Sequence, residues 1–336
     1  MRKIISGKKP VSPRANEGGT TIIEFLVASA IGLFVSSVVG YAYIANKESW
    51  NFNVQESRLQ DRGRYITNLL NADLRLAGFR GCVRKNEILT IPPTGFAVTD
   101  LQDRLRDGVR AAESGEHTTA LNVFAPVEGG NFRLAAALPQ GSENPALAAT
   151  PSSPAMITER HVDPSSNAVV NAVSFVLIDD CTNAAEFARA TVDPGTGNIT
   201  VHGATGVEHD HYTIVTWYNW GGANGENGIG YSFDPDARKL WRNGQLLADN
   251  VESFRVCLGI DSDGNNVVDR LDFGTSNFTQ TLSVHIDLVL ASSLPVLDQP
   301  GMASFNLCDS YRWTSAADRR LRRLSSTSVT LRNKLR

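Results

Sequence analysis

Six residues between Asp261 and Asp272 have the types and the spacing of calcium ligands. In this twelve-residue stretch, side-chain oxygens stand at positions 1, 3, 5, 9 and 12, and position 7 offers a backbone carbonyl: Asp261, Asp263, Asn265, Val267, Asp269 and Asp272. Hard oxygen ligands at this spacing are typical of an EF-hand-like Ca²⁺ loop. However, Gly264 stands at position 4 rather than 6, and Asp272 replaces a longer Glu. The alternative is a hairpin loop rich in Asp, Asn and Gly that binds nothing.

Two other groups of side chains have chemical potential. His209 and His211 alternate within residues 208–211, so on a strand they would point the same way and could hold a transition metal. Because no distant third ligand is evident, we favour a solvated strand start. The glycine-rich run 221–230 is surrounded by the aromatic residues Trp217, Tyr218, Trp220 and Tyr231. They could form a sugar-binding or partner-binding edge, although aromatic strand residues are more often core or cross-strand pairs.

The motifs of common catalytic sites are absent from the sequence. There is no GxSxG elbow, no HExxH, no P-loop and no GxGxxG after a strand, so we expect no enzyme. A net charge of -3 gives no general electrostatic reason to bind nucleic acid. We interpret the basic run Arg319–Arg323 as a solvated helix or strand edge, with DNA contact as the lesser alternative.

The four cysteines predict disulfides rather than a metal site. Cys82, Cys181, Cys257 and Cys308 lie far apart and show no CxxC spacing. Four cysteines allow three pairings. We favour Cys82 with Cys181, which would tie a helix end to a strand region, and Cys257 with Cys308, which would close the calcium-like loop and its return strand. Disulfides require an oxidising compartment.

The N-terminal segment supplies a route to such a compartment. Phe25 to Asn46 are 22 residues without a charge, and a helix of that length covers about 30 Å, the thickness of a bilayer core. Basic residues precede this stretch, so we expect the N-terminus in the cytoplasm and the chain after Lys47 in the periplasm or outside. The alternative is an ordinary signal anchor or secretory signal peptide, but no clear small-x-small cleavage site follows the apolar core. An acidic residue, Glu24, also stands just inside its start, where a charge is costly.

With its basic leader ending in Gly19, followed by Thr20-Thr21-Ile22-Ile23-Glu24, the sequence resembles the type IV prepilins. That resemblance implies cleavage between Gly19 and Thr20 by a prepilin peptidase, which makes Glu24 the fifth mature residue. It also implies that Glu24 neutralises the α-amino group of a neighbouring subunit in the apolar filament core. The family most often has Phe where this chain has Thr20, so N-methylation of the first residue is less secure.

The remaining chain predicts a long helix followed by strands. Tyr65, Leu69, Ala72 and Leu76 recur at helical spacing without a proline, and Gly78 and Gly81 are expected to end the helix. Two helices broken at Gly63 are the alternative. Residues 92–164 are rich in Ala, Pro, Gly and Ser and contain stretches, such as 139–145, that read as loop. Alternating patterns predict strands at 120–125, 172–178, 212–218, 231–233, 239–241, 246–247, 251–260, 282–290 and 325–332.

These patterns predict an α+β fold with a long N-terminal helix and a β-rich C-terminal domain. The resemblance to the prepilins implies that this fold is pilin-like, with the outer half of the helix packed on an antiparallel sheet. The expected organisation is a cleaved leader at 1–19, a transmembrane and filament-core helix at 20–46, its amphipathic continuation at 47–81, and a globular domain at 82–336. Residues 76–82, 239–245, 250–254 and 329–333 resemble the PilW family of minor pilins in particular.

The PilW resemblance implies a non-enzymatic structural subunit of a type IV pilus, supporting twitching motility, that primes assembly and sits at or near the tip. Its partners would be other minor pilins, the major pilin, the prepilin peptidase and the inner-membrane assembly platform. It would reside in the inner membrane and then in the surface pilus. The alternatives are a minor pseudopilin of type II secretion and a membrane-anchored, calcium-dependent binding protein or adhesin.

Overall fold

The computed structural model describes residues 21–82, 88–90, 98–126, 131–134, 137–143, 146–147, 161–162, 169–170, 173–181, 185–192, 199–209, 213–220, 228–274 and 278–334. The chain falls into two compact units, Met1–Asn53 and Val54–Arg336, which are described separately. The expected boundary between membrane helix and outer helix, near residue 46, lies a few residues before the boundary of these units.

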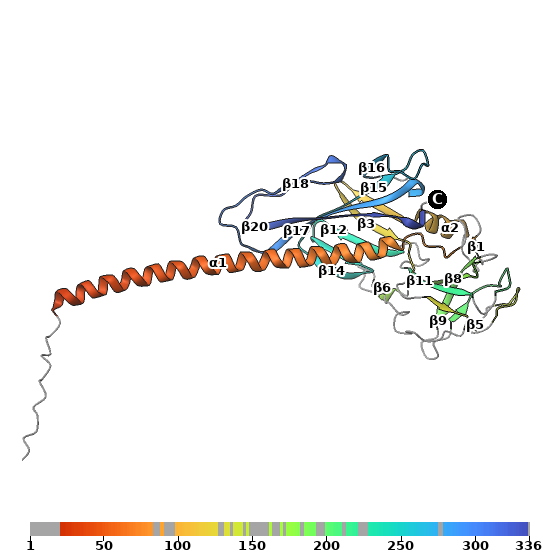
Figure 1. Cartoon of the computed structure of the whole chain (residues 1–336), viewed down its shortest axis with the longest axis horizontal. Helices are drawn as coiled ribbons and strands as arrows, with labels where there is room; N and C mark the ends of the chain where they lie inside the picture. Colours follow the sequence, from red (N-terminus) through yellow and green to blue (C-terminus); the bar gives the residue numbers. More distant parts are fainter. Residues whose placement is uncertain are drawn as a thin grey trace, which may run out of the picture. The chain divides into compact units, whose positions relative to one another are not determined.

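One helix, α1 (Ile22–Arg75), runs without interruption through Gly63, so the alternative of two helices is wrong (Figure 1). In the first unit, the described residues 21–50 are exposed on every side. The helix ends at Arg75, earlier than Gly78. Its last turn tightens into i to i+3 hydrogen bonds, and the Gly78 N–H then donates to Phe124 O at 2.8 Å instead of continuing the helix.

In the second unit, α1 buries one face against strands. Leu59, Ile66, Leu70 and Leu74 are almost fully buried at helical spacing. The predicted series Tyr65, Leu69, Ala72 and Leu76 is not the buried face, because Tyr65 and Ala72 are exposed. Gly63 lies on the same face. A Cβ atom at this position would come within 2.2 Å of Ser325 Oγ, so glycine permits the close approach of helix and sheet.

Two antiparallel sheets share a core with this half of α1. The first has the order β16-β15-β17-β20, and the second β14-β13-β12-β3-β2. Apolar side chains from α1 and from both sheets form one cluster. The first sheet consists of β16 (Arg270–Asp272), β15 (Val251–Ile260), β17 (Thr281–Pro295) and β20 (Arg320–Thr330). The second consists of β14 (Gln245–Asp249), β13 (Lys239–Arg242), β12 (Ile229–Asp234), β3 (His117–Val123) and β2 (Val109–Ser114).

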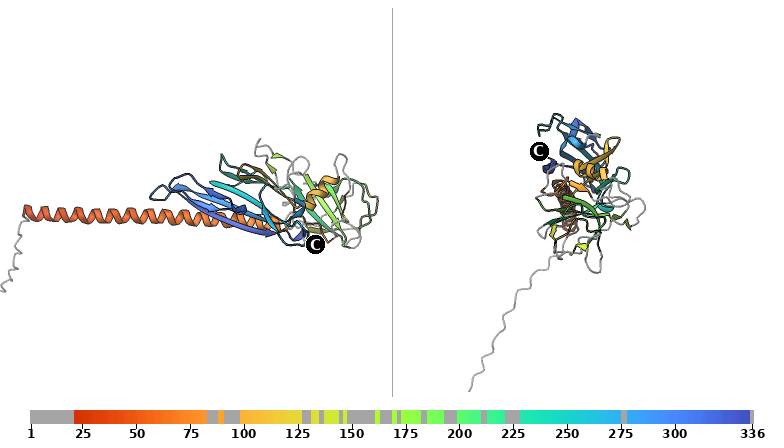
Figure 2. Two further views of the ribbon diagram at one scale, coloured as in Figure 1. Left: turned by 90° about the horizontal axis from the view of Figure 1, so that it is seen from above. Right: turned by 90° about the vertical axis from the view of Figure 1, so that its right-hand side faces the viewer.

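A seven-stranded sheet forms a further part of the second unit, with apolar clusters of its own. It lies beyond the C-terminal end of α1 (Figures 1 and 2). Its order is β4-β11-β8-β9-β10-β5, with β1 parallel to β9 and the other pairs antiparallel. The strands are β1 (Ile88–Thr90), β4 (Asn131–Arg133), β5 (Ala146–Leu147), β8 (Val173–Asp179), β9 (Ala185–Val192), β10 (Ile199–Val201) and β11 (Ile214–Trp220).

Short elements complete the described chain: α2 (Val98–Asp107), the hairpins β6 (His161–Val162) with β7 (Val169–Val170) and β18 (Ser304–Asn306) with β19 (Arg312–Thr314), and the 3₁₀ turns η2 (Phe278–Gln280), η3 (Cys308–Ser310) and η4 (Arg332–Lys334). Within 92–164, the strand expected at 120–125 corresponds to β3, whereas α2, β2, β4, β5 and β6 were not predicted. The α+β class, with a long helix and antiparallel sheets, is confirmed.

Candidate functional site

The start of α1 is the first candidate site, and its N-terminal end is capped within the chain. The Thr21 N–H donates to Glu24 Oε2 at 3.0 Å, and the Glu24 N–H donates to Thr21 Oγ1 at 3.3 Å. This reciprocal arrangement is a capping box, which satisfies donors that the helix leaves free. The signal was present in the sequence as Thr-x-x-Glu and was missed. Gly19 and Thr20 lie outside the described residues.

The N-terminal half of α1 carries a long apolar surface. It is long and apolar enough to cross a membrane, which fits the single-pass anchor of a pilin. Its large apolar side chains are more than half exposed: Ile22, Ile23, Phe25, Leu26, Val27, Ile31, Leu33, Phe34, Val35, Val38, Val39, Tyr41, Tyr43 and Ile44. Exposed apolar surface of this extent requires lipid or other subunits around it.

The second half of α1 is fixed to the five-stranded sheet by a buried carboxylate. Asp73 Oδ2 accepts hydrogen bonds from Tyr231 Oη at 2.5 Å and from Arg242 Nε at 2.9 Å, while Oδ1 accepts from Arg242 Nη2 at 3.1 Å. Burial, together with the negative charge of Asp73, raises the pKa of Tyr231 well above its usual value, against the opposing effect of Arg242. The phenol therefore acts only as a neutral donor to Asp73.

The calcium-like loop folds around Asp261. Its carboxylate accepts backbone N–H bonds from Gly264, Asn265 and Asn266 at 2.7–3.1 Å. Burial alone would raise the pKa of Asp261, but these donors hold it below the usual value. Asn266 takes the left-handed conformation at φ 65°, as the shift of glycine to position 4 requires.

The structure brings together three of the expected ligands. Carboxylate oxygens of Asp261, Asp263 and Asp269 all lie within 4.8 Å of one another. Asn265 is turned into the loop, with its side-chain amide donating to Asp263 Oδ2 at 3.0 Å. Asp272, on β16, is instead engaged by Arg270 Nε, at 2.8 Å from both carboxylate oxygens. A calcium ion could therefore use the first part of the loop, but position 12 is already occupied by an ion pair.

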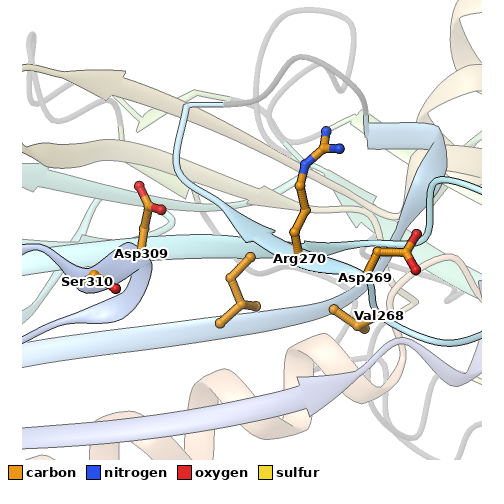
Figure 3. A pocket seen from close by; sticks show the side chains of 6 residues that line it. Val268, Asp269, Arg270, Asp309 and Ser310 are labelled. Atoms are coloured by element: carbon orange, nitrogen blue, oxygen red, sulfur yellow. The ribbon is translucent and has the colours of Figure 1, made fainter.

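An open pocket lies beside this loop and is shown in Figure 3. It is lined by Val268, Asp269, Arg270 and Leu271 from the loop and by Asp309 and Ser310 from the η3 turn. Arg255 contacts the η3 turn, because its Nε donates to Cys308 O at 3.3 Å. Its guanidinium also lies 3.6 Å and 4.5 Å from the ring centroids of Phe273 and Tyr311. The second disulfide also fixes this turn, because it joins Cys308 to Cys257 on β15.

Both disulfides have the pairing favoured from the sequence, Cys82 with Cys181 and Cys257 with Cys308. The first joins the chain just after α1 to the end of β8. The second spans a sequence separation of 51 residues and closes the loop and return strand.

Two interpretations of other side chains are corrected. His209 is not a solvated strand start: it is fully buried, with Nε2 3.2 Å from Glu186 Oε2 on β9, while His211 lies outside the described residues. Within the basic run, Arg322 on β20 is not solvated, because Glu252 and Asp318 both pair with it at 2.6 Å.

For the aromatic residues, the favoured interpretation as core is confirmed where the structure describes them. Trp217, Tyr218 and Tyr231 are almost fully buried, so they form core rather than a binding edge. The side chain of Trp220 lies outside the described residues.

Comparison with known proteins adds two matches. Residues 231–333 match the family described as Type IV Pilus-assembly protein W. The chain is also 39% identical over 77 residues to the Pilin-like protein PilA3 of Thermus thermophilus, which covers 22% of this chain and 33% of that protein. The chain thus spans about a third of the length of this relative. No solved structure matches.

The region that matches the family contains the hairpin of β12 and β13, the long strands β15, β17 and β20, and the calcium-like loop. It therefore includes the whole sheet β16-β15-β17-β20 that packs on α1, and the strands β12, β13 and β14 of the second sheet, but not β2 and β3. Residues 231–333 are thus similar to the PilW family, and the long apolar helix ahead of them agrees with the similarity to a pilin-like protein.

Proposed function

We propose that this protein is a minor pilin of a type IV pilus, which primes assembly and sits at or near the tip. The observation that carries the proposal is the helix α1, which begins at Ile22 as an exposed apolar helix and continues without a break into a sheet-packed helix ahead of a PilW-like region. The family description, a pilus-assembly protein, supports a role in assembly rather than as the repeating subunit.

The part of the chain that follows α1, here called the head, supports a position of this subunit at the end of the filament. Beyond the two sheets that share a core with α1, it carries a seven-stranded sheet with separate apolar clusters. A bulky head is easier to accommodate at an end than in every repeat of a filament wall. In this role the chain is non-enzymatic, and its partners are other minor pilins, the major pilin and the inner-membrane assembly platform.

Processing follows from the same role. A prepilin peptidase would cut between Gly19 and Thr20 while the apolar helix is in the inner membrane, with the head in the periplasm. Glu24 would then exchange its bond to the Thr21 N–H for the α-amino group of a neighbouring subunit, because either charge alone would be costly in an apolar filament core.

N-terminal analysis of the mature protein, with and without the peptidase, tests the processing step. A start at Thr20 only when the peptidase is present is the expected result, and any other start refutes it. Deletion of the gene separates the pilus from type II secretion. Loss of surface pili and twitching with normal exoprotein secretion supports the minor pilin, and the reverse outcome assigns a pseudopilin.

We also propose Ca²⁺ as the ligand of the loop at 261–272. The clustering of Asp261, Asp263 and Asp269 favours this ion, since carboxylates are ligands that calcium prefers. Exposed Val267, Val268 and Leu271 beside the cluster would give a calcium-ordered loop an apolar contact surface, as in an adhesin.

A further inference from the structure

A buried carboxylate lies between the two half-cystines of the Cys82–Cys181 disulfide. Asp179 is the last residue of β8 and is only 2% exposed. Its Oδ2 accepts the N–H of Cys82 at 2.6 Å, and its Oδ1 accepts the N–H of Cys181 at 2.9 Å. Two backbone donors from distant parts of the chain therefore fix this carboxylate in one orientation.

In this orientation Asp179 reaches a sulfur atom. Its Oδ2 lies 3.0 Å from Cys82 Sγ, a distance at which a thiol can donate a hydrogen bond to a carboxylate. The backbone around the contact is adapted to it. Gly81 has a φ of +69°, and a Cβ at this position would lie 1.9 Å from Asp179 Oδ2. Only glycine leaves room for the carboxylate beside Cys82.

The described side chains around Asp179 supply no counter-ion to its carboxylate. The fully buried phenol of Tyr218 on β11 is close enough to be affected by this carboxylate: burial and the negative charge of Asp179 raise its pKa. Arg80, two residues before Cys82, acts on Tyr218 in the opposite direction. Among the residues that the structure describes, none forms an ion pair with Asp179.

The second disulfide provides a natural contrast. Asp287 likewise accepts the N–H of a half-cystine, Cys308, at 2.6 Å. However, its other oxygen faces His285 Nε2 at 3.2 Å and also accepts a bond from Ser326. In the described part of the chain no contact joins Asp287 to a sulfur atom. Cys257 and Cys308 are buried, whereas Cys82 and Cys181 are exposed to an external reagent.

We propose that Asp179 is the proton acceptor that promotes closure of the Cys82–Cys181 disulfide, with Cys82 as the first attacking thiol. Thiolates, not thiols, are the nucleophiles of disulfide exchange. The Cys82 thiol passes its proton to Asp179, and the thiolate attacks a disulfide of an oxidant, such as a thiol–disulfide oxidase or oxidised glutathione. A Cys82–oxidant bond forms, and the other sulfur of the oxidant leaves and takes up that proton.

The second step restores the carboxylate. The Cys181 thiol loses its proton to Asp179 and attacks Cys82 Sγ, which releases the remaining sulfur of the oxidant as a thiolate that takes up this proton. Two thiols of the chain are oxidised to one disulfide, and one disulfide of the oxidant is reduced to two thiols. The inference goes beyond the proposed function and requires no particular filament.

The test follows both disulfides in the same sample. The full chain in detergent micelles is reduced, freed of reductant and mixed with oxidised glutathione, and each disulfide is quantified over time by mass spectrometry. At about pH 6.5, where an ordinary thiol is about 1% ionised, Asp179→Asn should close Cys82–Cys181 at least about tenfold more slowly. At about pH 9.5 the difference should shrink to less than about twofold, since thiols there ionise unaided.

Closure of Cys257–Cys308 should be unaffected by Asp179→Asn at either pH, which makes this pair the internal control. Equal closure rates in wild type and variant at the lower pH overturn the proposal. Equal slowing at both pH values also overturns it, because a role limited to backbone positioning would not depend on thiol ionisation.

Two further measurements need no Asp179 variant. In the wild type, the closure rate of Cys82–Cys181 should fall less on going from about pH 9.5 to about pH 6.5 than that of Cys257–Cys308, and equal falls refute the role of Asp179. In single variants, Cys181→Ser should form a mixed disulfide with glutathione faster than Cys82→Ser. The reverse order refutes Cys82 as the first attacking thiol.

Discussion

The contact of Asp73 with Tyr231 and Arg242 should be the strongest polar link between α1 and the sheet. We expect Asp73→Asn to lower the free energy of unfolding because it removes the carboxylate that pairs with the Arg242 guanidinium. Removal of one partner from a buried ion pair costs about 3–5 kcal/mol. Arg242 keeps 21% of its side chain exposed, so water offsets part of the loss and the value should lie at the lower end, about 3 kcal/mol.

A matched control lies on the same helix and the same sheet. Arg62 of α1 pairs with Asp249 of β14 at 2.7 Å, but the two side chains are 42% and 51% exposed. Exposed pairs contribute less than about 1 kcal/mol. Asp249→Asn removes the same charge at that surface contact, so the two variants differ mainly in the burial of the pair.

Urea unfolding of the full chain in detergent, followed by near-ultraviolet circular dichroism, measures both variants against the wild type. Asp73→Asn should lower the transition midpoint clearly, and Asp249→Asn should leave it almost unchanged. Tyr231→Phe removes one donor to Asp73 and should cost about 1–2 kcal/mol, with less than additive loss when combined with Asp73→Asn. Equal effects of Asp73→Asn and Asp249→Asn would refute the reasoning.

Three other predictions concern metal, pH and the C-terminus. Asp261→Ala with Asp263→Ala should abolish any rise in melting temperature on addition of Ca²⁺, and if the wild type shows no such rise the loop is only a turn. The hydrogen bond to Asp287 raises the pKa of His285 from 6.5, so its stabilisation is complete below that value and is lost as pH rises through the higher folded value. His285→Gln should therefore destabilise the chain more at about pH 6 than at about pH 9, and an equal loss at both contradicts the assignment. Lys334 Nζ is buried and donates to Asp107 O and Phe278 O. Lys334→Met leaves both carbonyls without this donor and should lower the free energy of unfolding, measured in urea, by about 2 kcal/mol. An unchanged free energy of unfolding would show that this contact contributes nothing.

Much of the fold could be predicted because its signals are local. The charge-free stretch of α1 and the alternation of apolar and polar residues in β15 and β17 are properties of neighbouring residues. The length of the first and the period of the second were therefore sufficient to predict a helix and two strands. The helix α2 has no such local signal, so it was missed. It is short and mostly polar, and its stability comes from tertiary contacts such as burial of Leu105.

The polar contacts that fix the fold could not be predicted, because they join residues far apart in sequence. Asp73 meets Arg242 across a sequence separation of 169 residues, and Arg322 meets Glu252 across 70. No periodic pattern marks such partners, so charged residues look solvated until the sheet register is known. His209 was misread in the same way, because its partner Glu186 comes from another strand.

The Cys82–Cys181 disulfide also determines how the chain responds to tension. A pull between α1 and the C-terminus passes from Cys82 directly to Cys181 through the disulfide, so the residues between them, across a separation of 99, receive no force. At about 3.4 Å per extended residue, roughly 330 Å of chain is protected from stretching. With this crosslink closed, β1 to β8 stay unstretched however hard the two ends are drawn apart, and when it is reduced that length can be pulled out.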